Sequence, residues 1–185
     1  MWKKSGRKSA TEQERDVTDR DRSRERTMNR AVRLLAAKPR SVRELRERLL
    51  DKMWTDEEIV ESVIAKLSDY KYLDDDQYAR DVALSKLRQN PQGKRRLEMT
   101  MSQRKLDKET IDAAVATAFD EMPEDDLIDI AIQKRLRIKG KPETRDDAKK
   151  FYDHLLRRGF SYDLIRTKMS GLAARSYDPS EGDQL

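Results

Sequence analysis

Residues 41–59 read SVRELRERLLDKMWTDEEI, and this stretch contains the pattern that decides the fold. Leu45 and Leu49 are four positions apart, so they share one face of a helix. Ser41 is suited to cap that helix, with Glu44 as the partner of a capping box. A further apolar stripe begins at Ile59. The stretch therefore predicts two short helices joined by a turn.

The same spacing returns twice along the chain. Three pairs of apolar residues are each separated by 14 positions: Leu45 and Ile59, Leu97 and Ile111, and Phe151 and Ile165. A polar cap is expected before each second member, and a large apolar residue of the hydrophobic-staple kind precedes each cap: Trp54 and Thr55, Leu106 and Asp107, and Phe160 and Ser161. Another helical stripe precedes each pair, which predicts an all-α fold of three tandem three-helix, helix-turn-helix-like repeats. We expect them to stack into an elongated, curved array.

The repeats divide the chain into five segments. Fifteen of the first 27 residues are charged, so we predict a disordered N-terminal arm over 1–27, with a fraying helix as the open alternative. The repeats are expected at 28–70, 75–120 and 123–176, followed by a flexible acidic tail over 177–185. The first repeat should begin with an inward face of Val32, Leu35 and Ala36, and the second with Asp75 or Asp76 as cap.

The composition argues against several classes of function. The chain has no cysteine and one histidine, which excludes a disulfide scaffold, a thiolate metal site and most multi-histidine sites. His154 corresponds to Arg48 of the first repeat and is expected to face solvent. The six glycines form no phosphate-binding loop, and the acidic groups 74–76 and 125–126 begin helices, where capping explains them. We expect no enzymatic activity and no cofactor or metal.

No apolar stretch is long enough to span a membrane, and the N-terminus lacks the apolar core of a signal peptide. We therefore expect a cytoplasmic location and no membrane partner.

Charge is distributed unevenly along the chain. The net charge of +5 comes from 41 basic and 36 acidic residues. Residues 31–76 hold 9 basic and 11 acidic residues, whereas 77–120 hold 9 and 6, and 121–176 hold 13 and 10. Residues 1–30 hold 10 basic and 6 acidic residues, so a polyanion partner is expected at the N-terminus and at the last two segments rather than at 31–76.

Within the repeats, the third helices of the first two copies are acidic and the second helices of the last two are basic. A helix-turn-helix reader inserts its final helix into the major groove of DNA. Here DNA phosphates would repel the acidic third helices. Contact with nucleic acid or protein carboxylates would instead use the basic positions, and the open alternative is a solvated helix face. The candidate contact residues are Arg88, Lys94, Arg95, Arg96, Arg104, Lys105, Lys149, Lys150, Arg157 and Arg158.

Three separated motifs resemble the RecX family of bacterial regulatory proteins. They are Ser41–Leu50 (SVRELRERLL), Tyr72–Ala79 (YLDDDQYA) and Arg157–Ile165 (RRGFSYDLI), in the family's order and within its repeat frame. The chain departs from the family pattern at Met53 and Lys105, where glycine is common, and at 90–94, where NPQGK replaces a glycine-lysine-glycine-proline run.

The resemblance implies a modulator of the RecA recombinase. Such proteins lie in the groove of the RecA filament on single-stranded DNA and suppress its ATPase and strand exchange. We expect the chain to be a monomer. Its expected partners are RecA and, as part of the RecA filament, single-stranded DNA. Whether RecA is inhibited or disassembled stays open. Two alternatives remain, a nucleic-acid-binding architectural or transcriptional protein that acts without RecA, and a scaffold for another helical partner.

Overall fold

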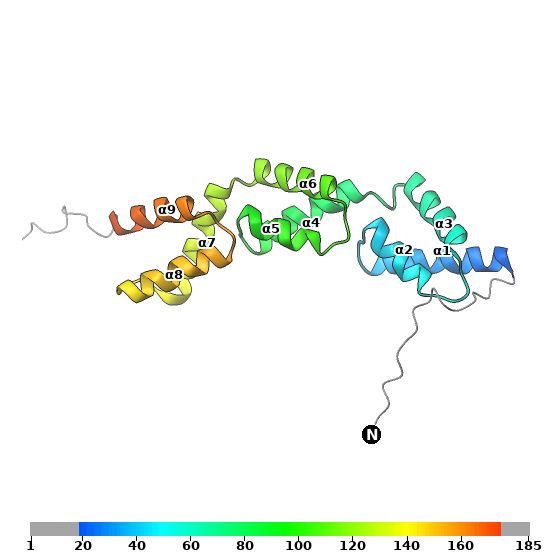
Figure 1. The fold of residues 1–185 in the computed structure, drawn as a ribbon, viewed down its shortest axis with the longest axis horizontal. Helices are drawn as coiled ribbons and strands as arrows, with labels where there is room; N and C mark the ends of the chain where they lie inside the picture. Colours follow the sequence, from blue (N-terminus) through cyan, green and yellow to red (C-terminus); the bar gives the residue numbers. More distant parts are fainter. Residues whose placement is uncertain (1–18, 175–185) are drawn as a thin grey trace, which may run out of the picture. The chain divides into compact units, whose positions relative to one another are not determined.

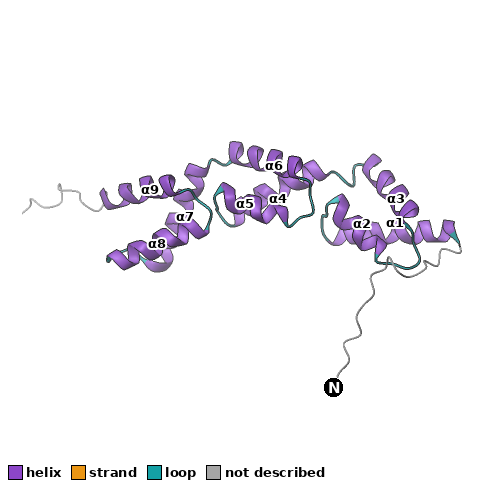
Figure 2. Cartoon of the chain, viewed as in Figure 1, coloured by secondary structure: helices purple, strands orange, loops and turns teal. Residues whose placement is uncertain are grey.

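The computed structural model describes residues 19–174, and every regular element in that range is an α-helix (Figures 1 and 2). The helices follow one another in three groups of three, which confirms the predicted all-α fold of three tandem three-helix repeats. The helices of the described range are α1 (Arg20–Ala37), α2 (Val42–Leu50), α3 (Glu57–Asp69), α4 (Asp75–Gln89), α5 (Lys94–Ser102), α6 (Lys108–Glu121), α7 (Glu124–Lys139), α8 (Arg145–Arg157) and α9 (Tyr162–Ala174).

The described residues form two compact units. The first contains the residues through Tyr78 together with Arg104–Asp107, and the second contains 79–103 and the residues from Lys108 onward. The core of the first unit gathers side chains that are at most 5% exposed: Ala31, Leu45, Leu49, Val60, Val63, Ile64, Leu67 and Leu73. The core of the second unit includes the buried residues Leu87, Leu97, Met101, Val115, Leu127, Ile128, Phe151, Leu155, Phe160 and Ile165.

Helix α1 begins earlier than the sequence predicted. Residues 20–27 are helical, so the predicted disorder of the arm 1–27 is wrong for that part. The Asp19 carboxylate accepts a hydrogen bond from the Arg22 N–H at 3.0 Å, which caps the helix. Arg20 pairs with Asp56 and Glu58 at 3.2 and 2.8 Å. Residues 1–18 of the arm and the predicted tail over 177–185 lie outside the described residues.

The inner face of α1 is partly polar. Ser23, Thr27 and Ala31 are buried at successive four-residue steps, whereas Val32 is 50% exposed. The predicted inward face, which included Val32 and Ala36, is therefore wrong. Apolar periodicity could not identify this face because two of its three buried residues carry hydroxyl groups.

Those hydroxyl groups are paired inside the first unit. The Thr27 hydroxyl donates to the Ser23 carbonyl at 2.8 Å, and its oxygen lies 2.9 Å from the Thr55 hydroxyl oxygen. A hydroxyl has one proton, so Thr55 donates in the second hydrogen bond. Thr55 is fully buried, and this contact joins α1 to the turn before α3. The Thr55 hydroxyl is thus used in the contact with α1 rather than as the cap of α3.

The caps of four helices can be compared with the sequence predictions. Ser41 and Ser161 cap α2 and α9 as predicted, accepting from backbone N–H groups three residues later at 3.2 and 3.3 Å. Asp56, not Thr55, caps α3 by accepting from the Ile59 N–H at 2.8 Å. The carboxylate of Asp74, rather than Asp75 or Asp76, accepts at the start of α4.

The buried threonine pair predicts a specific loss of stability. Thr27→Val keeps the shape of the side chain but removes the hydrogen bond to Thr55, which should lower the free energy of unfolding by about 1–2 kcal/mol. Urea denaturation followed by circular dichroism measures the change. Thr167→Val is the matched control, because Thr167 also donates to a carbonyl four residues earlier but is exposed. Equal midpoints for the two variants would contradict this role of Thr27.

Candidate interaction surface

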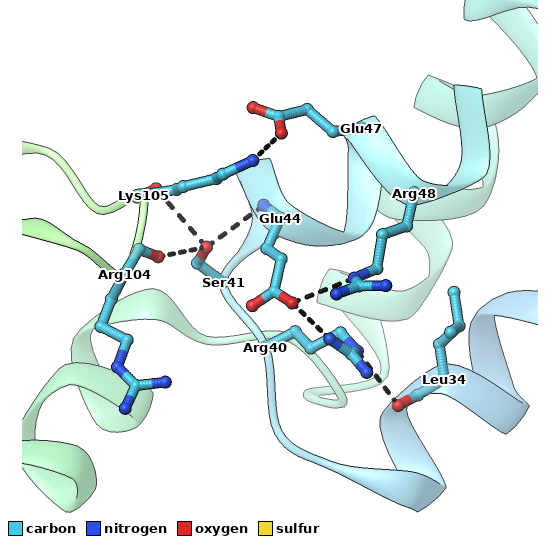
Figure 3. Close-up of polar contacts among 8 residues, drawn as sticks. All are labelled: Leu34, Arg40, Ser41, Glu44, Glu47, Arg48, Arg104 and Lys105. Atoms are coloured by element: carbon cyan, nitrogen blue, oxygen red, sulfur yellow. Dashed lines mark hydrogen bonds and ion pairs between the residues drawn. The ribbon is translucent and has the colours of Figure 1, made fainter. Parts of the chain in front are cut away.

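In the first unit, the N-terminus of α2 bonds to the turn between α5 and α6 (Figure 3). The buried Ser41 hydroxyl donates to the Arg104 carbonyl at 2.9 Å, with the Lys105 carbonyl at 3.4 Å. The next backbone N–H, of Val42, donates to the Asp75 carboxylate at 2.9 Å. The first N–H groups of a helix lack partners within the helix, and a neighbouring segment supplies one here.

The second unit contains the same arrangement at the N-terminus of α5. The Gly93 N–H donates to the Arg158 carbonyl at 2.9 Å, in the turn between α8 and α9. The next backbone N–H, of Lys94, donates to the Glu124 carboxylate at 3.2 Å. Asp75 and Glu124 are each the first residue of the helix that begins the following repeat. We call each of these arrangements a repeat junction.

The two repeat junctions use corresponding positions. Gly93 and Lys94 follow Ser41 and Val42 by 52 residues, and the accepting carbonyls of Arg104 and Arg158 are 54 residues apart. The apolar pairs repeat at the same two offsets. The sequence reasoning missed Asp75 and Glu124 as acceptors, because an acidic residue at the start of a helix is already explained by the helix dipole.

The junctions differ in how closely the backbones approach. A Cβ atom on Gly93 would lie 2.1 Å from the Gly159 carbonyl oxygen, and one on Gly159 would lie 2.5 Å from the Arg96 Cβ. Gly159 has φ of +87°, and Lys105 at the corresponding position has φ of +58°. The side chain of Ser41 spans the wider gap of the first junction, which leaves room there for a residue with a Cβ atom. Met53 does not share this left-handed backbone.

A carboxylate between two arginines lies beside the first junction. Glu44 accepts from the Arg48 Nε at 3.0 Å and from Arg40, which also donates to the Leu34 carbonyl at 3.3 Å (Figure 3). Burial raises the pKa of the Glu44 carboxyl, but the hydrogen bonds from Arg48 and Arg40 outweigh it and hold that pKa below its ordinary value. For Asp75, burial dominates and the pKa is raised.

Most of the predicted contact residues are exposed. Lys94, Arg95 and Arg96 occupy the first turn of α5 and form no ion pair within the described residues. Lys150 has only a distant partner, with its Nζ 3.9 Å from Asp147. Lys105 is exposed too but pairs with Glu47, and we call the other exposed members of the predicted set the exposed basic set: Arg88, Lys94, Arg95, Arg96, Lys149, Lys150 and Arg157.

Three of the predicted contact residues lie beyond the second helices, in turns. Helix α5 ends at Ser102 and α8 at Arg157, so the assignment of Arg104, Lys105 and Arg158 to those helices is wrong. The Lys105 ammonium pairs with Glu47, and the Arg104 carbonyl belongs to the first junction. These contacts hold the turn within the first unit.

Arg158 is held within the second unit by several hydrogen bonds. Its guanidinium donates to the Asn90 side chain, to the Pro91 carbonyl at 3.1 Å and to His154 Nε2 at 3.2 Å. His154 is half-buried rather than solvent-facing, and burial together with Arg135, Arg158 and Arg157 lowers its pKa. A neutral imidazole nitrogen can accept the hydrogen bond that Arg158 donates. Arg158 therefore joins α8 to the loop before α5.

The described part of the chain contains neither a metal-binding cluster nor a membrane-spanning helix. No group of three or more histidine, cysteine or acidic residues there could hold a metal ion. No described helix is long and apolar enough to cross a membrane. Tandem three-helix repeats with repeated junctions and exposed cations define an all-α repeat protein with surfaces suited to binding.

Comparison with known proteins identifies the family. Residues 28–67 match the first three-helix domain of RecX, 74–115 the second and 124–169 the third. Together these matches cover more than half of the chain, and the chain belongs to the RecX family.

Individual relatives agree with this assignment. A regulatory protein RecX from Bacillus velezensis is 30% identical over 85% of this chain and 59% of its own length. One from Clostridioides difficile is 27% identical over 78% of this chain and 66% of its own. The chain thus spans less than two thirds of these relatives. A regulatory protein RecX from Prosthecochloris aestuarii is 29% identical over 82% of this chain and 97% of its own length.

Solved structures support the fold. The crystal structure of RecX from Lactobacillus salivarius matches with a TM-score of 0.70 at 21% identity, covering 83% of this chain and 99% of that one. A second crystal structure, of a regulatory protein RecX, matches with a TM-score of 0.64 at 23% identity, covering 78% of this chain and 72% of that one.

The second junction predicts an unequal response of the glycines to alanine. Gly159→Ala combines a left-handed backbone with a clash, and we expect it to destabilise by about 2–4 kcal/mol. Gly93→Ala meets the clash alone. Gly140→Ala is the matched control, because its φ is +74° and nothing lies within 4 Å of the added Cβ. Its ψ of −178° is in a region that is essentially restricted to glycine, so the control should cost about 1–3 kcal/mol from backbone strain alone. Thermal denaturation ranks the three variants, and equal losses for Gly159 and Gly140 would contradict the close approach.

The lowered pKa of Glu44 predicts the sign of a pH effect. Its ion pairs stabilise the fold fully above the ordinary glutamate pKa, and that stabilisation is lost as the pH falls through the lowered value. Glu44→Gln should lower the free energy of unfolding at neutral pH by about 1 kcal/mol and have little effect near a pH of about 3. Urea denaturation at both pH values provides the measurement. Glu25→Gln, at an exposed residue without an ion pair in the described chain, is the control. A loss that is the same at both pH values would be inconsistent with this account.

Proposed function

We propose that this chain is a non-enzymatic regulator that binds the RecA filament on single-stranded DNA and lowers its ATPase and strand-exchange activities. The observation that supports the proposal most directly is the succession of all three RecX domains, in order, within residues 28–169. Relatives that share these repeats are regulatory proteins RecX, including one matched over 97% of its own length.

The exposed basic set supplies the chemistry for such a partner. A nucleoprotein filament repeats protein carboxylates and DNA phosphates along its length, and both attract guanidinium and ammonium groups. Each contact at an exposed side chain is weak on its own. Linked repeats convert the later contacts into intramolecular ones, so several weak contacts add through effective concentration.

Inhibition follows from contact with more than one RecA subunit. A regulator that bridges neighbouring subunits stabilises the arrangement it binds, and it therefore opposes the subunit changes that accompany ATP turnover. The regulator needs no catalytic group for this effect. The proposed contacts are the exposed basic set, and Arg104, Lys105 and Arg158 act within the chain.

The RecA ATPase on single-stranded DNA tests both the function and its residues. Titrating the wild-type chain should lower the ATPase rate to a plateau. A variant with Arg95, Arg96, Lys149 and Lys150 all changed to glutamine should need about tenfold more protein for half of that effect, a loss of about 1.4 kcal/mol in binding. The matched control changes four other exposed cations to glutamine: Lys66, Arg137, Lys139 and Lys141.

The outcomes separate the alternatives. An unchanged ATPase rate at saturating wild-type protein would refute the proposed function. Inhibition retained by the first variant, or equally weakened in the control, would refute the residue assignment alone. Tight, steeply salt-dependent DNA binding without any effect on RecA would favour a direct nucleic-acid-binding protein instead.

A further inference from the structure

A groove on the first unit has no role in the proposed contacts. It lies between α1 and the turn before α3 and has a volume of about 440 Å³. No acidic side chain lines it. Its lining residues are Arg26, Asn29, Arg30, Arg33, Leu34 and Trp54, and we call it the α1 groove.

The arginines of the α1 groove form a ladder. Arg26, Arg30 and Arg33 follow one another by four and three residues, so they project from one face of α1 at intervals of about 5–6 Å. None of them forms an ion pair with a carboxylate of the described residues. Arg20 and Arg24 of the same helix do pair, with Asp56 and Asp21. The ladder therefore keeps its charge available for a ligand.

Two further observations point to a ligand. The Arg30 Nε is buried and has no hydrogen-bond partner within the described part of the chain. Burying a charged donor without an acceptor costs free energy, which a bound acceptor would recover. In addition, the Arg26 guanidinium carbon lies 5.9 Å from the centre of the Trp54 ring. A planar cation beside an indole offers flat surfaces on which a nucleobase can stack.

We propose that the α1 groove binds a segment of single-stranded nucleic acid, with its phosphates on the arginine ladder and a base against Trp54. The inference rests on the proposed function in taking single-stranded DNA as the polyanion. Guanidinium groups bind phosphates in bidentate geometry. A nucleic-acid strand presents phosphates at regular intervals, and the ladder presents guanidinium groups at regular intervals. An acidic peptide would pair with the same arginines, but it has no base to stack on Trp54.

The groove spans two segments of opposite net charge: Arg26, Asn29 and Arg30 belong to the basic segment 1–30, and Arg33, Leu34 and Trp54 to the acidic segment 31–76. Residues 31–76 contain more acidic than basic residues. Several of those acids are paired within the unit, as Glu44 is with Arg40 and Arg48, Glu61 with Arg46, and Glu47 with Lys105. These carboxylates are thus held by other cations, one of which, Lys105, lies outside the segment, while the ladder stays unpaired.

Binding of a short fluorescein-labelled oligothymidylate to the full chain, without RecA, tests the groove. We expect Arg26→Gln, Arg30→Gln and Arg33→Gln together to weaken binding at least about tenfold. The slope of log affinity against log salt should fall by about 2, since each phosphate contact on a single strand contributes about 0.7. The matched control removes three arginines of the same unit outside the groove: Arg22, Arg24 and Arg43. Equal losses in the two variants would overturn the proposal.

A local signal completes the test. The chain has two tryptophans, so Trp2→Phe leaves Trp54 as the single fluorophore. The oligothymidylate should quench Trp54 emission, and polyglutamate of equal charge should not compete at equal concentration. Absence of quenching, or displacement by polyglutamate, would overturn the nucleic-acid assignment. Neither assay contains RecA, so failure of the groove is distinguishable from failure of the ATPase effect.

Discussion

The packing of the repeats within each unit depends on the hydrogen bonds at the repeat junctions. The first N–H groups of the second helix of a repeat have no partners within that helix. The core of a single repeat is too small to bury this helix end. In the second unit the Gly93 N–H meets the Arg158 carbonyl at 2.9 Å, and in the first unit Ser41 meets the Arg104 carbonyl. Each junction thus joins the start of a helix to a turn and fixes the position of that turn. The left-handed residues Lys105 and Gly159 follow from this, because each turn must present its carbonyl to that helix end.

Much of the fold was predictable because apolar spacing reports burial. The 14-residue interval placed Leu45, Ile59 and their counterparts in the core, and the structure buries all six of these residues. The face of α1 was not predictable in this way, since it uses Ser23 and Thr27, whose burial depends on hydrogen bonds to other residues. Thr55 resembled a helix cap for the same reason. A hydroxyl group suits both a cap and a buried pair, and only the tertiary partner decides between them.

The candidate site was less predictable than the fold. The sequence identified the basic residues but not which of them have partners within the chain. Arg157 and Arg158 are adjacent and chemically identical, yet α8 ends between them. Arg157 stays exposed on the helix, whereas Arg158 turns toward Asn90, Pro91 and His154. Helix ends are the least certain feature of a sequence-based prediction, so the different surroundings of these two arginines could not be assigned from the sequence.

Net charge is consequently a poor guide to where a polyanion can bind this protein. Carboxylates in a segment with an acidic excess can be held by cations of the same unit, as Glu44, Glu47 and Glu61 are. A basic segment loses free cations when its guanidinium groups serve the fold, as Arg158 does. What attracts a ligand is the set of cations left unpaired after folding. In this chain that set includes residues of α1 in the first repeat and of α5 and α8 in the later ones, so all three repeats offer a positive surface even though their net charges differ in sign.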